Sequence, residues 1–128
     1  MGLLDDIKTL IPSDAAEASS VFLGSYPDSP DNIVTLYRSG GFDRSRSFTN
    51  REYENPSVQV RVRDISYARA NDKMEIIKDA LDGLTEQSIN GNRYLSIMQQ
   101  GDVLPLGRDD KNRTELSLNF RVRVERNA

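Results

Sequence analysis

Two segments of the chain alternate between apolar and polar side chains, which is the pattern of half-buried β-strands. In residues 58–63 the apolar positions are valines, and the polar ones are Gln59, Arg61 and Arg63. Residues 116–125 repeat the pattern, with Leu, Phe and Val on one face and Arg121 and Arg123 among the polar residues of the other. The alternation predicts two strands with their apolar faces turned to the core and their polar faces turned away.

Two other segments have the spacing of amphipathic helices. Leu and Ile residues predict a short helix over residues 2–11, which makes residues 1–11 the N-terminal helical segment, and Pro12 ends it. The longer pattern covers residues 67–84, and its apolar positions are Ala70, Met74, Ile77, Leu81 and Leu84. Gly83 lies near the end of this pattern, as expected at a helix C-terminus.

Shorter apolar runs predict the remaining strands. Residues 21–23 and 33–37 flank a turn with two prolines and are expected to pair as neighbouring strands. Residues 94–98 follow an Asn-Gly-Asn turn signal, and residues 104–106 predict a short edge segment that runs into a turn.

Residues 38–56 show no periodicity and are predicted to form a long loop. Loops of this length are uncommon in compact domains and are often functional or ordered only on binding. The candidate residues for a flexible assembly loop are Arg38, Gly40, Gly41, Arg44, Arg46 and Arg51. A plain surface loop is the alternative.

These elements together predict an α+β fold. Residues 1–128 are expected to form a single domain, a mostly antiparallel β-sheet with one long helix packed on one face and a short N-terminal helix. The two alternating strands and the stripe of the long helix supply the apolar residues for one core.

The composition excludes several kinds of site. The chain has 128 residues, enough for one domain, and it contains no Cys and no His. Disulfides, thiol nucleophiles, Cys/His zinc sites and histidine acid–base catalysis are therefore impossible. No apolar run reaches the roughly 20 residues of a membrane helix, and the N-terminus lacks the features of a secretory signal. We expect an intracellular protein that is not an enzyme, contacts no membrane and holds no cofactor.

Two acidic clusters are the candidates for a metal site. They are Asp28 with Asp31, and Asp109 with Asp110. Magnesium sites often use two carboxylates, but Asp is also an ordinary turn residue. We therefore expect no metal at either cluster.

The net charge of −3 conceals a segregation along the chain. Residues 1–31 carry six acids against Lys8, whereas residues 38–63 carry six arginines against three acids. Arg is enriched in protein interfaces, where Lys is depleted. An acidic end and a basic middle are suited to a surface that binds its own neighbour, although a solvated mixed surface is the simpler reading.

The arginines on the polar faces of the two alternating strands are the main candidate site. If the two strands are neighbours, we expect one positive patch formed by Arg61, Arg63, Arg121 and Arg123. Like charges on one sheet face repel each other, so such a patch would need an anionic partner. The anion could be carboxylates of a neighbouring subunit or nucleic acid bound without sequence reading. A solvated face with partners inside the same chain is the alternative.

Three blocks, taken in order, are similar to a known family. They are residues 27–37 with Gly40 and Gly41, residues 56–63 with Tyr67 and Ala70, and residues 106–110 with Arg113 and residues 116–120. The sequence resembles the bacteriophage minor capsid or tail terminator family over nearly the whole chain after the first helix.

The resemblance implies a structural virion protein without catalytic residues. Such a protein forms a ring, expected to be hexameric, on the head-proximal end of a long non-contractile tail tube, where it stops polymerisation and offers the surface for head attachment. The implied partners are other copies of the chain, the tail tube protein and a head-completion or neck protein, with DNA passing through the lumen. The protein would be made in the cytoplasm of the host bacterium.

Two other functions remain open at the sequence level. Another connector of the same virion, such as a neck or head-completion protein, shares the same chemistry. A DNA-binding module that uses the arginine face is the second, although the acidic pI of about 5.0 argues against it. An enzyme ranks last.

Overall fold

A computed structural model describes residues 2–46 and 52–125, with the backbone alone at residues 18, 42–46 and 52. A single six-stranded sheet has the order β1-β2-β3-β6-β5-β4. Its strands are β1 (Val21–Leu23), β2 (Ile33–Arg46), β3 (Glu52–Asp64), β4 (Leu84–Ile89), β5 (Asn92–Arg108) and β6 (Thr114–Glu125). The helices are α1 (Leu3–Leu10), α2 (Tyr67–Leu81) and a short 3₁₀ turn (Ala18–Ser20). The predicted α+β class is confirmed.

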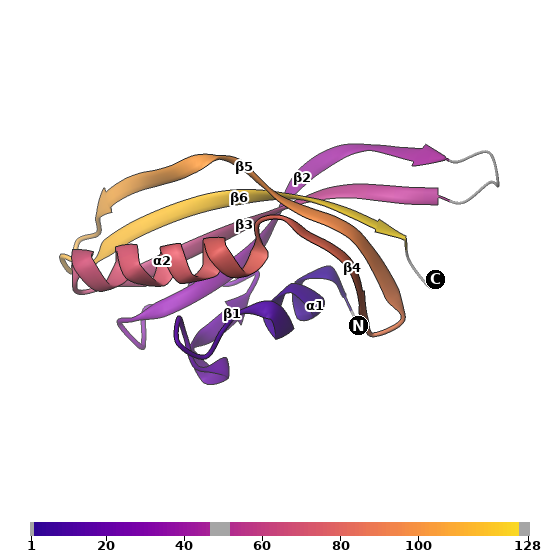
Figure 1. Ribbon diagram of the computed structural model, residues 1–128. Helices are drawn as coiled ribbons and strands as arrows, with labels where there is room; N and C mark the ends of the chain where they lie inside the picture. The colour runs from indigo at the N-terminus through magenta and orange to yellow at the C-terminus, as the bar shows by residue number, and fades with distance from the viewer. Residues whose placement is uncertain (1, 47–51, 126–128) are drawn as a thin grey trace.

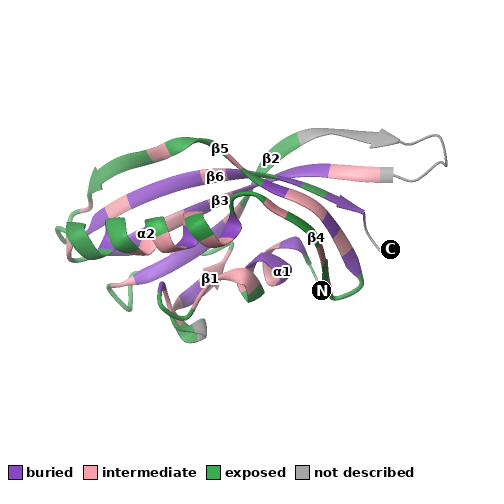
Figure 2. Cartoon of the chain, in the orientation of Figure 1, coloured by how far each residue is buried: buried purple, intermediate pink, exposed green. Residues whose placement is uncertain are grey.

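Both helices lie on the same face of the sheet (Figure 1), and the core lies between them and the strands. The apolar residues of β3 and β6 that alternate along the sequence are buried there, and α2 adds Ala70, Met74, Ile77 and Leu81 (Figure 2). Burial of each such side chain contributes roughly 1.5–3 kcal/mol. The two alternating segments are therefore strands with one core face, as predicted.

Helix α2 begins and ends where local signals direct it. The Ser66 hydroxyl accepts a hydrogen bond from the Arg69 amide (3.3 Å), which satisfies one of the free N–H groups at the helix start. The helix ends at Leu81, and Gly83 with φ of 85° turns the chain into β4. Leu84, predicted as the last apolar position of the helix, instead begins β4, a strand that the hydrophobic pattern does not predict.

Helix α1 is fixed to the sheet by a buried carboxylate. Leu3 and Ile7 pack in the core, and the fully buried Asp6 accepts hydrogen bonds from Asn90 (2.7 Å), Asn92 (3.0 Å) and the Tyr94 hydroxyl. These donors come from the β4–β5 turn and the start of β5. The first helix is therefore attached to strands almost ninety positions later in the chain.

The prediction of a long loop at residues 38–56 is wrong. Residues 38–46 continue β2 and residues 52–56 belong to β3, so that the two strands form a long hairpin that projects past the helices (Figure 1). The pairing shifts register between Arg38 and Gly41, where Gly40 and Gly41 adopt φ of 87° and 135°. A Cβ on Gly41 would overlap the backbone of Asn55 and Pro56. Glycine at this bulge is therefore a structural requirement.

The sheet ends on each side in a short strand that pairs with only part of its longer neighbour. At one edge, β1 pairs in parallel with residues 34–36 of β2, which confirms the predicted pairing of these two runs. At the other edge, β4 pairs with β5 only as far as Ile97. Among the described residues, the rest of β5 pairs with β6 alone, and this includes the predicted edge segment at residues 104–106.

Candidate functional site

The sheet face opposite the helices, which we call the polar face, carries no helix of the described chain. Cross-strand pairing places one polar row across its middle, formed by Tyr37, Gln59, Asn119 and Gln100. The Ser57 hydroxyl and the Gln100 amide lie 3.3 Å apart in the same region. A shallow polar hollow opens here, so the middle of the polar face offers amides and hydroxyls to a partner.

The four predicted arginines do not form a single patch. Arg61 pairs with Ser117, whereas Arg121 pairs with Ser57, four residues before Arg61 in β3. This offset corresponds to about 13 Å along a strand. The polar face therefore has one arginine pair at each end, with the polar row between them.

Arg121 and Arg123 form the exposed pair. The Arg123 guanidinium lies over the Tyr53 ring, 4.9 Å from its centre, which orients the side chain along the face. Of the four arginines predicted to form the patch, these two have exposed side chains.

Arg63 is not available to a partner, and its assignment to a surface patch is wrong. The side chain is 1% exposed and donates to the backbone carbonyls of Pro30 (2.6 Å), Asp31 (3.0 Å) and Asp28 (3.2 Å). The turn between β1 and β2 folds over this end of the polar face and encloses the guanidinium. Arg63 is therefore a structural residue that holds the turn.

Arg61 is half-buried beside Arg63, and Tyr26 covers both. The Tyr26 ring centre lies 4.8 Å from the Arg61 guanidinium carbon and 5.0 Å from that of Arg63. The Tyr26 hydroxyl donates to Glu115 (2.6 Å). The pKa of Tyr26 is raised above its usual range, mainly by burial and to a smaller extent by this hydrogen bond to a carboxylate. The tyrosine therefore stays neutral while it closes this end of the polar face.

Arg113 ties the same turn to the β5–β6 turn. Its side chain is 3% exposed and pairs with Asp109 (2.7 Å), Asp28 (3.0 Å) and Asp31 (3.3 Å). Hydrogen bonds from Lys111 and Arg113 lower the pKa of the Asp28 carboxyl. Both acidic clusters named as metal candidates thus contribute ion-pair partners to one arginine.

The residues predicted to form a flexible assembly loop are not all in a loop. Arg38 is exposed on β2 next to the Gly40–Gly41 bulge, and the backbone of Arg44 and Arg46 continues this strand. Arg51 lies outside the described residues. The prediction that these residues share a flexible loop is therefore wrong for residues 38–46.

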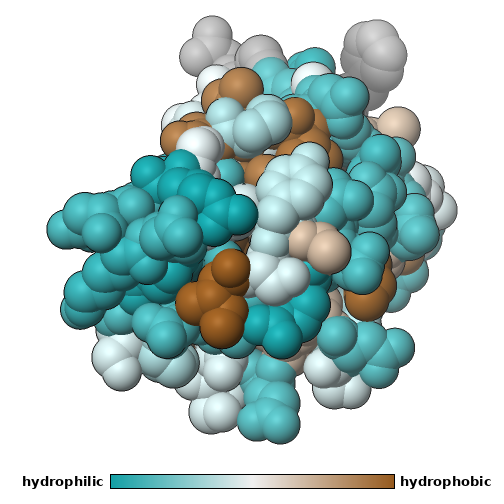
Figure 3. Space-filling view, turned by 90° about the vertical axis from the view of Figure 1, so that its left-hand side faces the viewer, coloured by the Kyte–Doolittle hydropathy of each residue, from teal (hydrophilic) through white to brown (hydrophobic). Residues whose placement is uncertain are grey.

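An exposed apolar patch on the β5 edge was not predicted as a site. Leu104 is 57% exposed and Leu106 is 38% exposed, and Tyr67 of α2 lines a small hollow together with Pro105. Figure 3 faces this end of the molecule and shows apolar side chains interrupting a polar surface. The signal in the sequence was the run Leu-Pro-Leu-Gly at an edge position.

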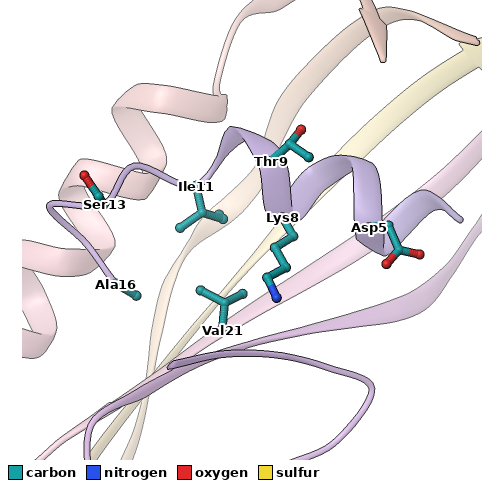
Figure 4. Close-up of a pocket in the computed structure, with 7 residues that line it drawn as sticks. All are labelled: Asp5, Lys8, Thr9, Ile11, Ser13, Ala16 and Val21. Carbon is teal, nitrogen blue, oxygen red and sulfur yellow. The ribbon is translucent and has the colours of Figure 1, made fainter. Parts of the chain in front are cut away.

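A hollow opens between α1 and β1 (Figure 4). It has a volume of about 480 Å³ and is lined by Asp5, Lys8, Thr9, Ile11, Ser13, Ala16 and Val21. The side chains of Ile11, Ala16 and Val21 make its floor apolar. This hollow lies at the β1 edge, which is the edge of the sheet opposite to the β5 patch.

Within residues 2–46 and 52–125, no helix is long and apolar enough to cross a membrane. The same part of the chain contains no group of three acidic side chains placed to hold a metal ion.

Comparison with known proteins identifies relatives by sequence and by fold. The family described as bacteriophage tail terminator protein matches residues 2–126. The comparison with curated proteins found no match. Among solved structures, a chain from the virion of a native gene transfer agent particle is similar, with a TM-score of 0.71 and 19% identity. The similarity covers 96% of this chain and 94% of the other, and at this identity it concerns the fold.

Proposed function

Because this chain belongs to the bacteriophage tail terminator family, we propose that it forms a ring that caps the head-proximal end of a phage tail tube. The chain is a structural component of a virion. In the proposed role the ring, a hexamer, stops tube polymerisation and offers the surface to which the head attaches. Its partners are further copies of itself, the tail tube protein and a head-completion or neck protein. The family match over residues 2–126 is the observation that carries the proposal.

The polar face is suited to line the lumen of such a ring. It exposes Arg121 and Arg123 beside a row of amide side chains. Arginines in this setting contact phosphates without reading sequence. DNA passing through the ring would meet a face whose arginines attract its phosphate backbone.

The uneven edges of the sheet also support a ring. A closed ring needs two different surfaces on each subunit that fit one another. In this chain the β1 edge carries a hollow and the β5 edge carries the exposed Leu104 and Leu106, so the two edges present different surfaces.

Electron microscopy of the protein alone and with purified tail tubes tests the proposal. We expect rings in solution or on one end of each tube, and tubes that no longer elongate after capping. A protein that stays monomeric and ignores tubes would contradict it. Gene deletion separates the neighbouring role, because loss of a terminator leaves overlong headless tails, whereas loss of a head-completion protein leaves leaking heads.

The exposed arginines favour DNA binding as a second candidate function. A titration with non-specific duplex DNA at several salt concentrations separates it from the first. A lumen-lining role predicts weak binding by the isolated subunit, and a DNA-binding module predicts tight binding that falls steeply with salt and with the double substitution Arg121→Gln and Arg123→Gln. Tight binding by a subunit that does not cap tubes would favour the second candidate.

A further inference from the structure

We propose that Asn90 is a site of spontaneous deamidation and that the docking of α1 on the sheet controls how fast it reacts. Asn90 and Gly91 form the two-residue turn between β4 and β5, and both residues are exposed. The dipeptide Asn-Gly occurs once in the chain. The proposal concerns the chemistry of this turn and does not depend on the proposed ring.

The reaction takes place within the turn and needs only water. The Gly91 backbone nitrogen gives its proton to water and bonds to the side-chain carbonyl carbon of Asn90. The bond from that carbon to Nδ2 then breaks, and Nδ2 takes up a proton and leaves as ammonia. Water opens the cyclic imide at the side-chain carbonyl to give Asp, or at the backbone carbonyl to give isoaspartate. Glycine favours the attack because it has no Cβ beside the nitrogen.

The folded structure holds the leaving group in place. Nδ2 of Asn90 donates a hydrogen bond of 2.7 Å to the carboxylate of Asp6, a fully buried residue of α1. Figure 1 shows the β4–β5 turn close to the start of this helix. A hydrogen bond to a charged group is stronger than one between neutral groups, and it is lost when Nδ2 departs. The docked helix therefore slows the reaction, and its release exposes the amide.

The backbone of the turn opposes the reaction in the same way. Asn90 and Gly91 adopt φ of 52° and 80°, which is the geometry that Asn-Gly favours in a two-residue hairpin turn. Ile89 and Asn92 pair directly on either side of the turn. Ring closure has to rotate the Asn90 side chain toward the next backbone nitrogen, so it is easier in a turn that has lost its contact with α1.

The product of the reaction would keep α1 released. Asp6 also accepts hydrogen bonds from Asn92 and from the Tyr94 hydroxyl, and deamidation replaces the third donor, Asn90, with a carboxylate. Two carboxylates at this distance repel, above all where one of them is buried. A helix of eight residues is marginal without tertiary contacts. Deamidation therefore converts a transient opening of α1 into a lasting one.

Leu3→Ala and Leu118→Ala form the matched pair that tests the control by α1. Both remove a buried leucine from the core (2% and 0% exposed), but only Leu3 lies on α1. We expect Leu3→Ala to deamidate at Asn90 about 30-fold faster than the wild type or more, because loss of a buried leucine favours the open helix by this factor. Leu118→Ala should react at close to the wild-type rate, since β6 stays in place when α1 opens locally.

Peptide mass spectrometry after incubation at mildly alkaline pH measures the reaction, as the mass difference between amide and acid. Isoaspartate at position 90 is the signature of the cyclic imide. Asn112 is the internal reference, because it also has a positive φ (60°) but is followed by Arg113 in place of glycine. It should stay intact over the same time. If Leu3→Ala fails to fold, Ile7→Val replaces it, with Ile77→Val as its control, and a smaller acceleration is expected.

Asn90→Asp tests the effect of the product on α1. Asn90→Gly is its control, because it removes the donor, adds no charge and tolerates the positive φ. We expect amide hydrogen exchange in α1 to be about 10- to 100-fold faster in Asn90→Asp than in the wild type, with Asn90→Gly between the two.

Three results would overturn the proposal. The absence of deamidation at Asn90 in urea-unfolded protein would remove the site. Equal rates in folded wild type and Leu3→Ala, or equal acceleration by Leu118→Ala, would remove the control by α1. Wild-type hydrogen exchange of α1 in Asn90→Asp would show that the product does not release the helix.

Discussion

Arg63 gives the sharpest test of the structure, because alternation assigned it to the surface and the fold buries it. Substitution with Met keeps the length of the side chain and removes its donors. The carbonyls of Asp28, Pro30 and Asp31 then lose their partner, and the turn between β1 and β2 loses its main attachment to β3. The expected result is a less stable protein in which this turn opens first.

The size of the effect follows from the three hydrogen bonds. A hydrogen bond to a charged group contributes about 1.5–3 kcal/mol. The acceptors belong to exposed residues, so water replaces part of each bond when the arginine is removed. We expect Arg63→Met to lower the free energy of unfolding by about 2–4 kcal/mol. With an m-value near 2 kcal/mol/M, the urea midpoint falls by about 1–2 M.

Urea denaturation followed by circular dichroism at one protein concentration measures this effect. Arg121→Met is the matched control on the same face, and it should change stability by no more than about 0.5 kcal/mol. Arg63→Lys keeps the charge but not the planar fork and should fall between the two. Equal midpoints for Arg63→Met and Arg121→Met would refute the role of Arg63 in holding the turn.

Three further predictions concern stability. Burial raises the pKa of Asp64, but the hydrogen bonds that it accepts outweigh burial and lower this pKa overall. The carboxylate therefore stabilises the fold above about pH 4, and the stabilisation is lost as pH falls through the folded pKa. Asp64→Asn should make the free energy of unfolding less dependent on pH in the acid range, and an unchanged acid dependence would contradict this. Ser66→Ala removes the cap of α2 and should cost about 1 kcal/mol in urea denaturation, whereas no loss would show that the cap is dispensable. Tyr94→Phe removes one donor to Asp6 and should cost about 1–3 kcal/mol; hydrogen exchange should then accelerate first in α1, and uniform acceleration would argue against a local anchor.

The core strands and the main helix were predictable because their patterns are local. Val58, Val60 and Val62 face the core simply because they alternate in a strand that the helix covers on one side. The hairpin arm at residues 38–46 and 52–56 projects past both helices (Figure 1), and its sequence lacks the alternation that reveals a strand. Strand β4 was missed for a related reason, since its residues are mostly exposed or half-exposed at the edge.

Whether each of the four arginines is buried or exposed depends on tertiary contacts that the alternation of polar and apolar residues does not encode. Arg61 and Arg63 occupy the same kind of position as Arg121 and Arg123, yet the β1–β2 turn covers only the first pair. The turn is held by Arg113, 85 positions away from Asp28 in the chain. The hollow between α1 and β1 likewise depends on how elements distant in the sequence pack together, which alternation does not encode.

The residues that anchor α1 and the turn between β1 and β2 are translated much later than these two segments. Asp6 waits for donors 84 to 88 positions downstream, and Asp28 waits for Arg113. Neither partner has left the ribosomal exit tunnel when α1 and the first turn emerge. Nascent chains therefore carry these segments without part of their anchors until residues 92–113 emerge, and a product lacking β5 and β6 would leave Asp6 without Asn92 and Tyr94 and the proline turn without Arg113.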